Sequence, residues 1–270
     1  INGETLVFTF FPHPQRLFNA KIKMLNSLKS KLRLIESLGV ENVLIIPFTK
    51  DFAIITPQEF VHQILAKRLQ TSHVVAGFNY SFGYKGLGDA DMLVKLAEEQ
   101  NIKATIMAPF RIGNELVSST KIREYIKEGK IENAAKLLGY QPRISGKVIQ
   151  GNKIGRKIGF PTANVEWDKE LLIPGNGVYA VKVMVDERSY FGVLNIGNKP
   201  TVSQKPVLTM EVNILNFSGD LYQKEIEIIF YEKIRNEIKF NSLEHLKNQI
   251  AQDIQKSIGI FSALDFQINQ

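Results

Sequence analysis

Cysteine is absent from the 270-residue sequence, and so are long apolar runs. Without cysteine the chain has no disulfide, no thiolate metal ligand and no cysteine nucleophile, so its chemistry rests on other groups. No apolar run approaches the roughly 20 residues that a membrane-spanning helix requires, and the sequence has no signal-peptide pattern. These absences predict a folded cytoplasmic protein that has no membrane partner.

A dense basic block is also missing, although the net charge is +7. This charge suits nucleotides, phosphorylated cofactors, nucleic acids or acidic membrane surfaces, and charge alone does not choose among them. The lysines and arginines are spread along the chain, so solvated helix faces account for most of them. Because neither a basic recognition helix nor an aromatic-basic platform is present, we expect no nucleic-acid partner.

The hydrophobic pattern changes near residue 140, and this change predicts two domains, residues 1–140 and 141–270. In the first, short apolar runs alternate with amphipathic stretches, which is typical of β-α units that build a parallel sheet. The expected strands are residues 6–10, 43–47, 73–76 and 104–107. The expected helices are residues 27–38, 57–69, 91–100, 120–128 and 131–138.

Beyond residue 140 the apolar residues alternate with a period of two, which predicts an antiparallel barrel or sandwich. The expected strands are residues 144–150, 178–185, 190–196, 207–215 and 224–232. A closing helix is expected over residues 242–258. Four apolar residues on one face of this helix are predicted to pack in the core: Leu243, Leu246, Ile250 and Ile254.

A glycine-containing turn over residues 151–164 follows the first of these strands. Its three glycines free the backbone to approach a ligand, and three basic side chains place positive charge beside exposed amides: Lys153, Arg156 and Lys157. Such a turn favours phosphate, but the spacing fits neither the Walker pattern nor the dinucleotide fingerprint. From the glycine spacing alone, a flexible hairpin is the preferred interpretation.

The same segment, Gly-x-x-x-Gly-Arg-x-Ile-Gly-Phe-Pro-Thr-Ala-Asn, resembles the signature of the riboflavin kinase family. The rest of that family's pattern follows in order, at residues 177–180, 195–201, 211, 219–222 and 235–240. Six ordered blocks over about ninety residues are a specific match, unlike a lone short pattern. The resemblance implies ATP- and Mg²⁺-dependent phosphorylation of riboflavin to FMN, carried out by a six-stranded antiparallel β-barrel with a terminal helix.

Phosphoryl transfer needs a metal that bridges nucleotide phosphates, a positive cradle and a group that takes the proton of the attacking hydroxyl. By resemblance, Thr162 and Asn164 hold Mg²⁺, and Glu211 is the general base for the riboflavin 5′-hydroxyl. From the residues alone, a polar turn and a solvent-facing strand residue are the alternatives. The resemblance further implies ATP or phosphate contacts at Gly151, Gly155, Arg156, Gly159, Thr162 and Asn164, and a flavin-side loop with Arg235 and Glu237. In that loop Ile238 departs from the family, which commonly has a polar residue there.

Four motifs of the first half stand at strand ends or at a helix start: residues 9–14, 48–53, 77–83 and 118–123. In an open α/β sheet, ligands collect at the carboxyl ends of the strands. Over essentially all of residues 5–140, the set resembles the FMN adenylyltransferase module that precedes the kinase in bacterial bifunctional FAD synthetases. The resemblance implies a Rossmann-like nucleotidyltransferase domain that adenylylates FMN to FAD and releases pyrophosphate.

Within this module, Ser119 and Thr120 offer hydroxyls and backbone amides at a helix start, and Arg123 adds a cation one turn later. This combination suits ATP phosphates, although such a sequence taken alone is more often an N-cap. Asn79 is expected to bind a nucleotide or flavin phosphate, with a turn asparagine as the alternative. His13 is either a ligand contact or a structural histidine.

One segment of the adenylyltransferase pattern, Gly-x-Phe-Asp-Gly-x-His-x-Gly-His, is absent from the sequence. In the family it supplies the cations for the transition state. Because the chain begins at Ile1 without an initiator methionine, we expect residues before Ile1 in the natural protein. The leading hypothesis is a bifunctional FAD synthetase that binds riboflavin, FMN and ATP, and the alternative is a riboflavin kinase whose first domain is silent or regulatory. A homo-oligomer is compatible with the sequence.

Overall fold

The computed structural model describes residues 3–19, 21–151, 154–199 and 207–268. It has two compact units: an N-terminal unit made of Ile1–Ile22 and Leu28–Val117, and a barrel unit made of Lys23–Ser27 and Ser118–Gln270. The predicted boundary near residue 140 separates the two modules that the family resemblance implies, not these compact units, and it stays a prediction. Lys153, Pro200 and Thr201, which belong to the sequence motifs, lie outside the described residues.

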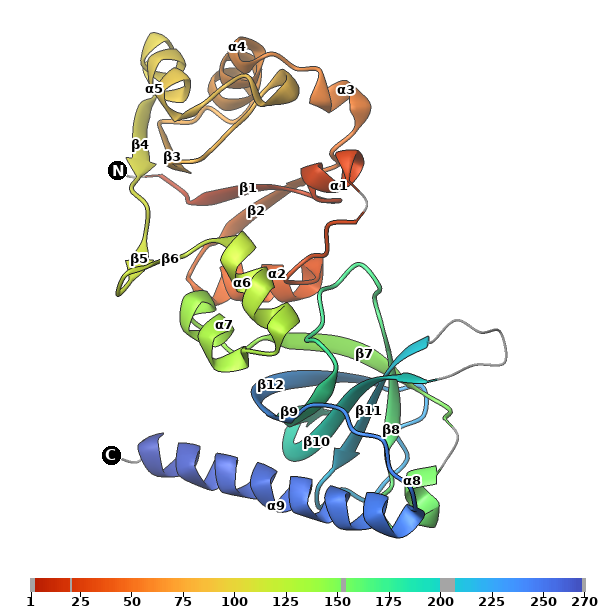
Figure 1. Ribbon diagram of the computed structural model, residues 1–270. Coiled ribbons are helices and arrows are strands. Elements are labelled where there is room, and N and C mark those ends of the chain that lie inside the picture. The colour runs from red at the N-terminus through yellow and green to blue at the C-terminus, as the bar shows by residue number, and fades with distance from the viewer. Residues whose placement is uncertain (1–2, 20, 152–153, 200–206, 269–270) are drawn as a thin grey trace. The chain divides into compact units, whose positions relative to one another are not determined.

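The N-terminal unit contains the four predicted strands as two parallel pairs (Figure 1). β1 (Leu6–Phe10) pairs with β2 (Asn42–Ile46), and β3 (His73–Gly77) pairs with β4 (Lys103–Met107). Within the described residues these pairs are separate two-stranded sheets, because no strand hydrogen-bonds to both. The parallel arrangement of the predicted α/β class is confirmed. A short antiparallel pair, β5 (Arg111–Ile112) with β6 (Glu115–Leu116), follows β4.

The connections of this unit are helical: α1 (Pro14–Phe18), α2 (Leu28–Ser37), α3 (Lys50–Ala53), α4 (Pro57–Glu59), η1 (Phe60–Arg68), η2 (Tyr84–Gly86) and α5 (Ala90–Glu99). α4 starts at a capping box, in which Thr56 Oγ1 accepts from the Glu59 amide at 3.2 Å and Glu59 Oε2 accepts from the Thr56 amide at 2.9 Å. η1 and α5 bury the apolar residues of the core: Phe60, Val61, Leu65, Leu93 and Ala97. Residues of β1, β3 and β4 pack against this core.

The barrel unit begins with α6 (Ser119–Glu128) and α7 (Ile131–Leu138), and its strands close into a six-stranded antiparallel barrel. The strands are β7 (Arg143–Ile149), β8 (Ala163–Trp167), β9 (Gly177–Val185), β10 (Arg188–Lys199), β11 (Val207–Ile214) and β12 (Glu225–Arg235). Their order around the barrel is β10-β11-β8-β7-β12-β9. The predicted barrel is confirmed. β8 was not among the strands expected from the alternation, and it follows a short helix, α8 (Ile154–Lys157), in the glycine-containing turn.

Alternate residues of every strand fill the interior of the barrel, as the period of two requires. The largest fully buried side chains include Tyr179, Leu194, Ile196, Met210, Ile226, Ile228 and Phe230. The aromatic rings of Tyr179 and Phe230 meet edge to face, with centroids 5.7 Å apart. One face of each strand is therefore committed to packing inside the barrel, and the outer face is available for polar side chains where no helix covers it.

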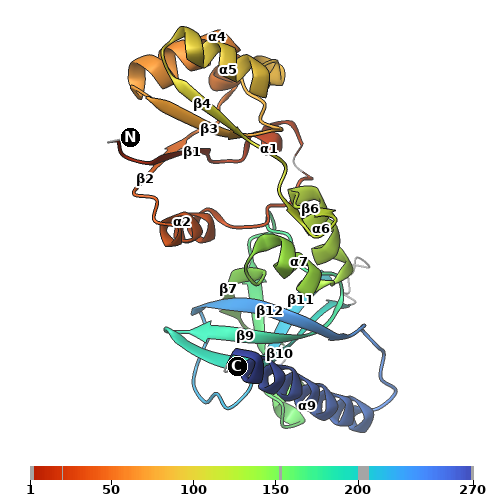
Figure 2. The same ribbon diagram turned by 90° about the vertical axis from the view of Figure 1, so that its left-hand side faces the viewer.

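The terminal helix α9 (Leu243–Ile268) runs along the barrel wall beside β9 and β10 (Figures 1 and 2). Its buried line is Asp253, Ser257 and Phe261. The prediction that Leu243 packs in the core was wrong, because its side chain is 63% exposed at the first turn. The predicted apolar face of this helix is displaced by about one residue from the face that the barrel covers. Among the described helices, none is both long enough and apolar enough to cross a membrane.

Candidate functional site

A row of polar side chains crosses the outer face of the barrel. Glu211 on β11 stands opposite Asn164 on β8 and opposite Asn195 on β10. Adjacent strands lie about 4.8 Å apart, and directly paired residues point to the same face. The neighbours of Glu211 in sequence, Met210 and Val212, are 1% and 0% exposed inside the barrel. Glu211 therefore points outward between two amide side chains, a placement that the alternation in the sequence did not decide.

Lys199, at the end of β10, makes an ion pair with Glu211 Oε1. The Glu211 side chain is 20% exposed, so it is half-buried rather than free in solvent. Lys199 shares the outer face with Asn195, four residues away on the same strand. The sequence motif contains Lys199 only at a variable position, so no signal identified it as a partner of Glu211.

The glycine-containing turn folds back closely on itself beside this row. A Cβ atom built on Gly151 would lie 2.0 Å from Asn164 Nδ2, so the amide of Asn164 occupies the space that a side chain at 151 would fill. A Cβ atom on Gly155 would lie 2.3 Å from the Phe160 carbonyl oxygen and 3.2 Å from Thr162 Oγ1. The Phe160 amide also donates to the Gly155 carbonyl at 2.8 Å. The turn thus brings the predicted metal ligands close to two backbone positions without side chains.

The other predicted residues of the turn are more open. Gly159 has a φ of +88°, a left-handed conformation that favours glycine. Arg156 is exposed. The turn is tied to the barrel by Asn213, which the sequence did not single out: its Nδ2 atom donates to the Pro161 carbonyl at 2.7 Å. Asn213 is 8% exposed and lies two residues after Glu211 on β11.

Arg235 ends β12, and its side chain is committed to helix α9. Its Nε atom donates to Asp253 Oδ1 at 2.9 Å and to Oδ2 at 3.1 Å, and its Nη2 atom donates to Oδ2 at 2.8 Å. The two side chains are 17% and 2% exposed. Nη1 donates to the Asn236 carbonyl at 3.0 Å. A role of Arg235 in binding phosphate stays a prediction.

Glu237 lies two residues beyond Arg235 and folds back onto β10. A Cβ atom on Gly197 would lie 1.9 Å from Glu237 Oε1, so glycine at this position makes room for the carboxylate. Asn176 Nδ2 donates to Glu237 Oε2 at 3.3 Å. Since Gly197 lies between Asn195 and Lys199 on the outer face of β10, Glu237 is brought to the flank of Glu211 that is opposite to Asn164.

The N-terminal unit has an aromatic pocket of about 440 Å³ at the carboxyl ends of β1, β2 and β3. Six rings line it: Phe10, Phe48, Phe52, Phe60, Tyr80 and Phe82. The rings of Phe10 and Phe52 are 5.2 Å apart, and those of Tyr80 and Phe82 stack at 5.5 Å. Burial raises the pKa of Tyr80 to about 12. The motifs that contain five of these rings, all but Phe60, were expected at the strand ends, but the pocket itself was not predicted.

His13 and Asn79 stand next to residues of this pocket in the sequence. His13 caps α1, and its Nδ1 atom accepts from the Gln15 amide at 3.2 Å. Asn79 is exposed in the turn after β3. Pro14, Gln15 and Tyr80 line the pocket, whereas His13 and Asn79 are not among its lining residues. Their ligand contacts therefore stay predictions.

The remaining predicted residues of the adenylyltransferase, Ser119, Thr120 and Arg123, belong to the barrel unit. The cap of α6 is Ser118, whose Oγ atom accepts from the Lys121 amide at 3.2 Å, and Ser119 and Thr120 lie exposed in the first turn. Arg123 Nε donates to the Lys23 carbonyl at 3.1 Å, and burial lowers the pKa of its guanidinium. Arg123 thus joins α6 to the segment Lys23–Ser27.

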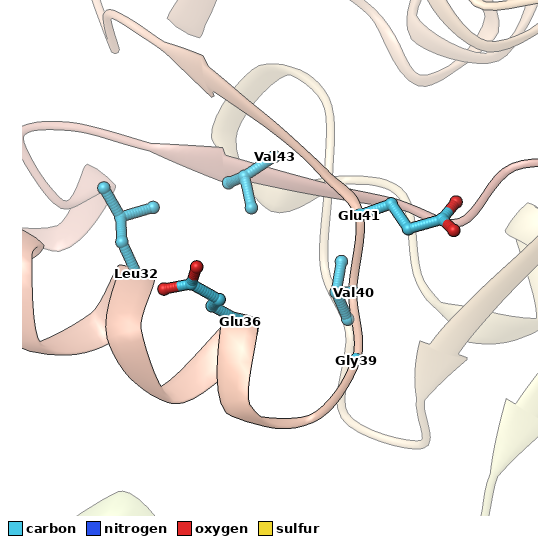
Figure 3. Close-up of a pocket in the computed structure, with 6 residues that line it drawn as sticks. All are labelled: Leu32, Glu36, Gly39, Val40, Glu41 and Val43. Carbon is cyan, nitrogen blue, oxygen red and sulfur yellow. The ribbon is translucent and has the colours of Figure 1, made fainter.

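A second pocket of the N-terminal unit, about 570 Å³ in volume, lies between α2 and β2 (Figure 3). Its two acidic residues, Glu36 and Glu41, point away from each other in Figure 3. The other lining residues are aliphatic or glycine, so the lining has no aromatic ring and no cation. This pocket fits neither a flavin ring nor a phosphate, and the aromatic pocket and the outer row of the barrel remain the candidate sites.

Comparison with known proteins finds matches to both halves. A family model described as riboflavin kinase matches residues 138–261, and one described as FAD synthetase matches residues 2–121. A protein of Listeria monocytogenes named bifunctional riboflavin kinase/FMN adenylyltransferase is 40% identical over 265 residues, which are 97% of this chain and 84% of the relative. One of the same name from Bacillus subtilis is 37% identical over 270 residues, with the same coverage of both chains. A crystal structure of a macrolide-efflux protein from Streptococcus pneumoniae has a TM-score of 0.85 and 29% identity, covering 94% of this chain and 83% of that one.

Proposed function

Because the chain belongs to the family of bifunctional riboflavin kinase/FMN adenylyltransferases, we propose that it converts riboflavin to FMN and then FMN to FAD, with ATP in both steps. The main support for this proposal is that the two family models match the two halves in order. The riboflavin kinase model matches the barrel, whose outer face carries Glu211 between Asn164 and Asn195. A kinase with a silent first domain is not favoured, since the FAD synthetase model matches residues 2–121.

In the kinase step, the 5′-hydroxyl of riboflavin attacks the terminal phosphate of ATP, and ADP leaves. Glu211 accepts the proton of that hydroxyl. The Lys199 ammonium holds Oε1 of Glu211 and leaves Oε2 for the substrate. Asn164 lies on one flank of Glu211 and Glu237 on the other, so phosphate binds on the β8 side and the flavin on the β10 side.

Thr162 and Asn164 are suitable for holding Mg²⁺ with the nucleotide. Both offer neutral oxygens, and the phosphates supply the negative charge that the cation requires. The missing Cβ atoms of Gly151 and Gly155 leave room for these side chains, and a side chain at either position would fill it. Mg²⁺ held by these two side chains would offset the negative charge of the nucleotide phosphates. Gly159 and Arg156 complete the cradle, with Arg156 as its cation.

In the adenylyl step, a phosphate oxygen of FMN attacks the α-phosphate of ATP, and pyrophosphate leaves. The aromatic pocket receives the isoalloxazine ring, because stacked and edge-on rings suit a flat aromatic ligand. Asn79 and His13, beside the pocket residues in sequence, bind the FMN phosphate. ATP contacts of Ser119, Thr120 and Arg123 at the start of α6 stay predictions.

The activity is tested by incubating the purified protein with riboflavin, ATP and Mg²⁺ and separating the flavins by chromatography with fluorescence detection. We expect FMN to form first and FAD to follow. Because the phosphates need a divalent cation, removal of Mg²⁺ with EDTA is expected to stop both products, and added Mg²⁺ to restore them. Absence of FMN in the presence of Mg²⁺ would contradict the kinase assignment.

Phe52→Ala is expected to raise the KM for FMN in FAD formation by about tenfold, since a ring stacked on an aromatic ligand contributes on the order of 1–3 kcal/mol. Phosphorylation of riboflavin should be unchanged, because Phe52 belongs to the N-terminal unit. Phe110→Ala is the matched control, since Phe110 is 68% exposed and does not line the pocket. An unchanged KM for FMN in Phe52→Ala would show that the flavin does not bind in this pocket.

A further inference from the structure

Asp253 on α9 is a buried acid that the proposed kinase step does not use. The whole residue is 1% exposed, and its carboxylate accepts hydrogen bonds from Arg235 and, at 3.0 Å, from Gln249 Nε2. Burying a carboxylate is unfavourable unless it is paired and its oxygens are hydrogen-bonded. Here both oxygens are satisfied, and the pair joins the terminal helix to the end of β12.

Asp253 is not needed to attach α9 to the barrel, because the helix has other anchors. Ser257 Oγ donates to the Gly192 carbonyl at 3.2 Å. The ring of Phe261 stacks on Phe191 at 4.3 Å and meets Tyr231 at 5.0 Å. These contacts lie one and two turns beyond Asp253 on the same face. The carboxylate of Asp253 therefore has a more specific partner, the Arg235 guanidinium.

Arg235 stands where the regular pairing of β12 ends. The register between β12 and β9 shifts twice, between Phe230 and Glu232 and between Lys233 and Arg235. After the second shift Arg235 pairs with Val178, which in turn pairs with Asn195, the neighbour of Glu211. Because the ladder is irregular here, strand pairing alone fixes this end of β12 weakly. The bidentate contact with Asp253 supplies the missing constraint.

The Arg235 side chain also organises the segment that follows it, residues 235–240, which we call the Arg235 loop. Its Nη1 atom holds the Asn236 carbonyl at 3.0 Å, and its guanidinium lies 5.8 Å from the centroid of the Phe240 ring. Between these two contacts, Glu237 reaches back to Gly197 on the outer face of β10. The position of the Glu237 carboxylate thus depends on Arg235, and that of Arg235 on Asp253.

We propose that Asp253 is a positioning residue for riboflavin phosphorylation, which acts through Arg235 to hold the Arg235 loop and Glu237 on the β10 flank of Glu211. This inference rests on the proposed kinase function. Asp253 touches neither the row nor the glycine-containing turn, so its effect falls on the flank that receives riboflavin. The cradle for the nucleotide on the β8 flank has its own anchor in Asn213.

The test compares Asp253→Asn with Ser257→Ala in the full chain. Asparagine keeps the shape of the aspartate but removes its charge, whereas Ser257→Ala removes an anchor of α9 that has no contact with Arg235. For Asp253→Asn we expect the KM for riboflavin to rise about tenfold or more, as loss of a charged hydrogen bond predicts, with the KM for ATP unchanged. For Ser257→Ala we expect a lower Tm and an unchanged KM for riboflavin.

Gln249→Ala is the milder variant if Asp253→Asn does not fold. It removes one hydrogen bond to Asp253 and leaves the charge in place, so the KM for riboflavin should shift in the same direction by a smaller factor. If the wild-type protein forms no FMN, the proposed function fails. If the wild type forms FMN and the variants of residues 253 and 249 lower only the Tm, with the KM for riboflavin unchanged, Asp253 is a structural residue and this inference is overturned.

Discussion

Glu211→Gln is expected to lower kcat for riboflavin phosphorylation by about 10²–10⁴-fold, the range that a positioned general base contributes. Glutamine has almost the same shape as glutamate but does not accept the proton of the 5′-hydroxyl. The KM for riboflavin should change little, since the amide still fits between Asn164 and Asn195. The measurement is the rate of FMN formation under saturating ATP and Mg²⁺.

Glu166→Gln is the matched control for this substitution. Glu166 lies on the outer face of β8, two residues from Asn164, and is exposed. The control removes the same charge from the same side of the barrel without touching the row, so FMN formation should stay at the wild-type rate. If Glu211→Gln and Glu166→Gln both retain wild-type activity, Glu211 is not the base.

Gly155→Ala is expected to reduce FMN formation by about 100-fold, because a displacement of roughly 1 Å in a positioning group has an effect of this size. The added Cβ atom would lie 2.3 Å from the Phe160 carbonyl oxygen, which is backbone and does not rotate away. The turn must therefore shift. Thr162 shifts with it, because its hydroxyl oxygen would lie 3.2 Å from the added Cβ atom. Rates of FMN formation across a range of Mg²⁺ and ATP concentrations measure the effect.

The control for this prediction is Gly259→Ala on α9, where an added Cβ atom meets nothing within 4 Å. Alanine is the better helix former, so this variant should be at least as stable as the wild type and fully active. Among the described residues of the turn, Ala163 alone packs against the barrel core, so the Tm of Gly155→Ala should fall by only a few degrees. Wild-type kinase activity in Gly155→Ala would show that FMN formation does not depend on the close packing of the turn.

Local patterns predicted most of the regular elements of this chain. The strands β1 to β4 are short apolar runs bounded by turn residues, and the period of two beyond residue 140 predicted five of the six barrel strands. β8 was missed because only two of its residues, Val165 and Trp167, are large apolar side chains buried in the barrel, too few to establish the alternation. The wrong prediction for Leu243 has a related cause, since the helical period defines an apolar face only to within a residue.

The candidate site was predictable as a set of residues and not as an arrangement. Motifs singled out Glu211, Asn164 and the glycines, because each belongs to an ordered block of the sequence. No motif indicated Lys199, Asn213 or Asp253, since their partners lie between 12 and 52 residues away along the chain. The aromatic pocket was missed for the same reason: its rings come from four separate segments.

The sequence by itself determined the two fold classes and the change of hydrophobic period between them. It also determined the chemical groups available, which are hydroxyls, amides and carboxylates but no thiol, and the glycine-containing turn. These depend on residue types and short-range spacing. Only the tertiary structure decided that Glu211 points outward between Asn164 and Asn195, and that the buried carboxylate of Asp253 holds Arg235. Strand register and burial are set by contacts between distant segments, and local spacing does not contain that information.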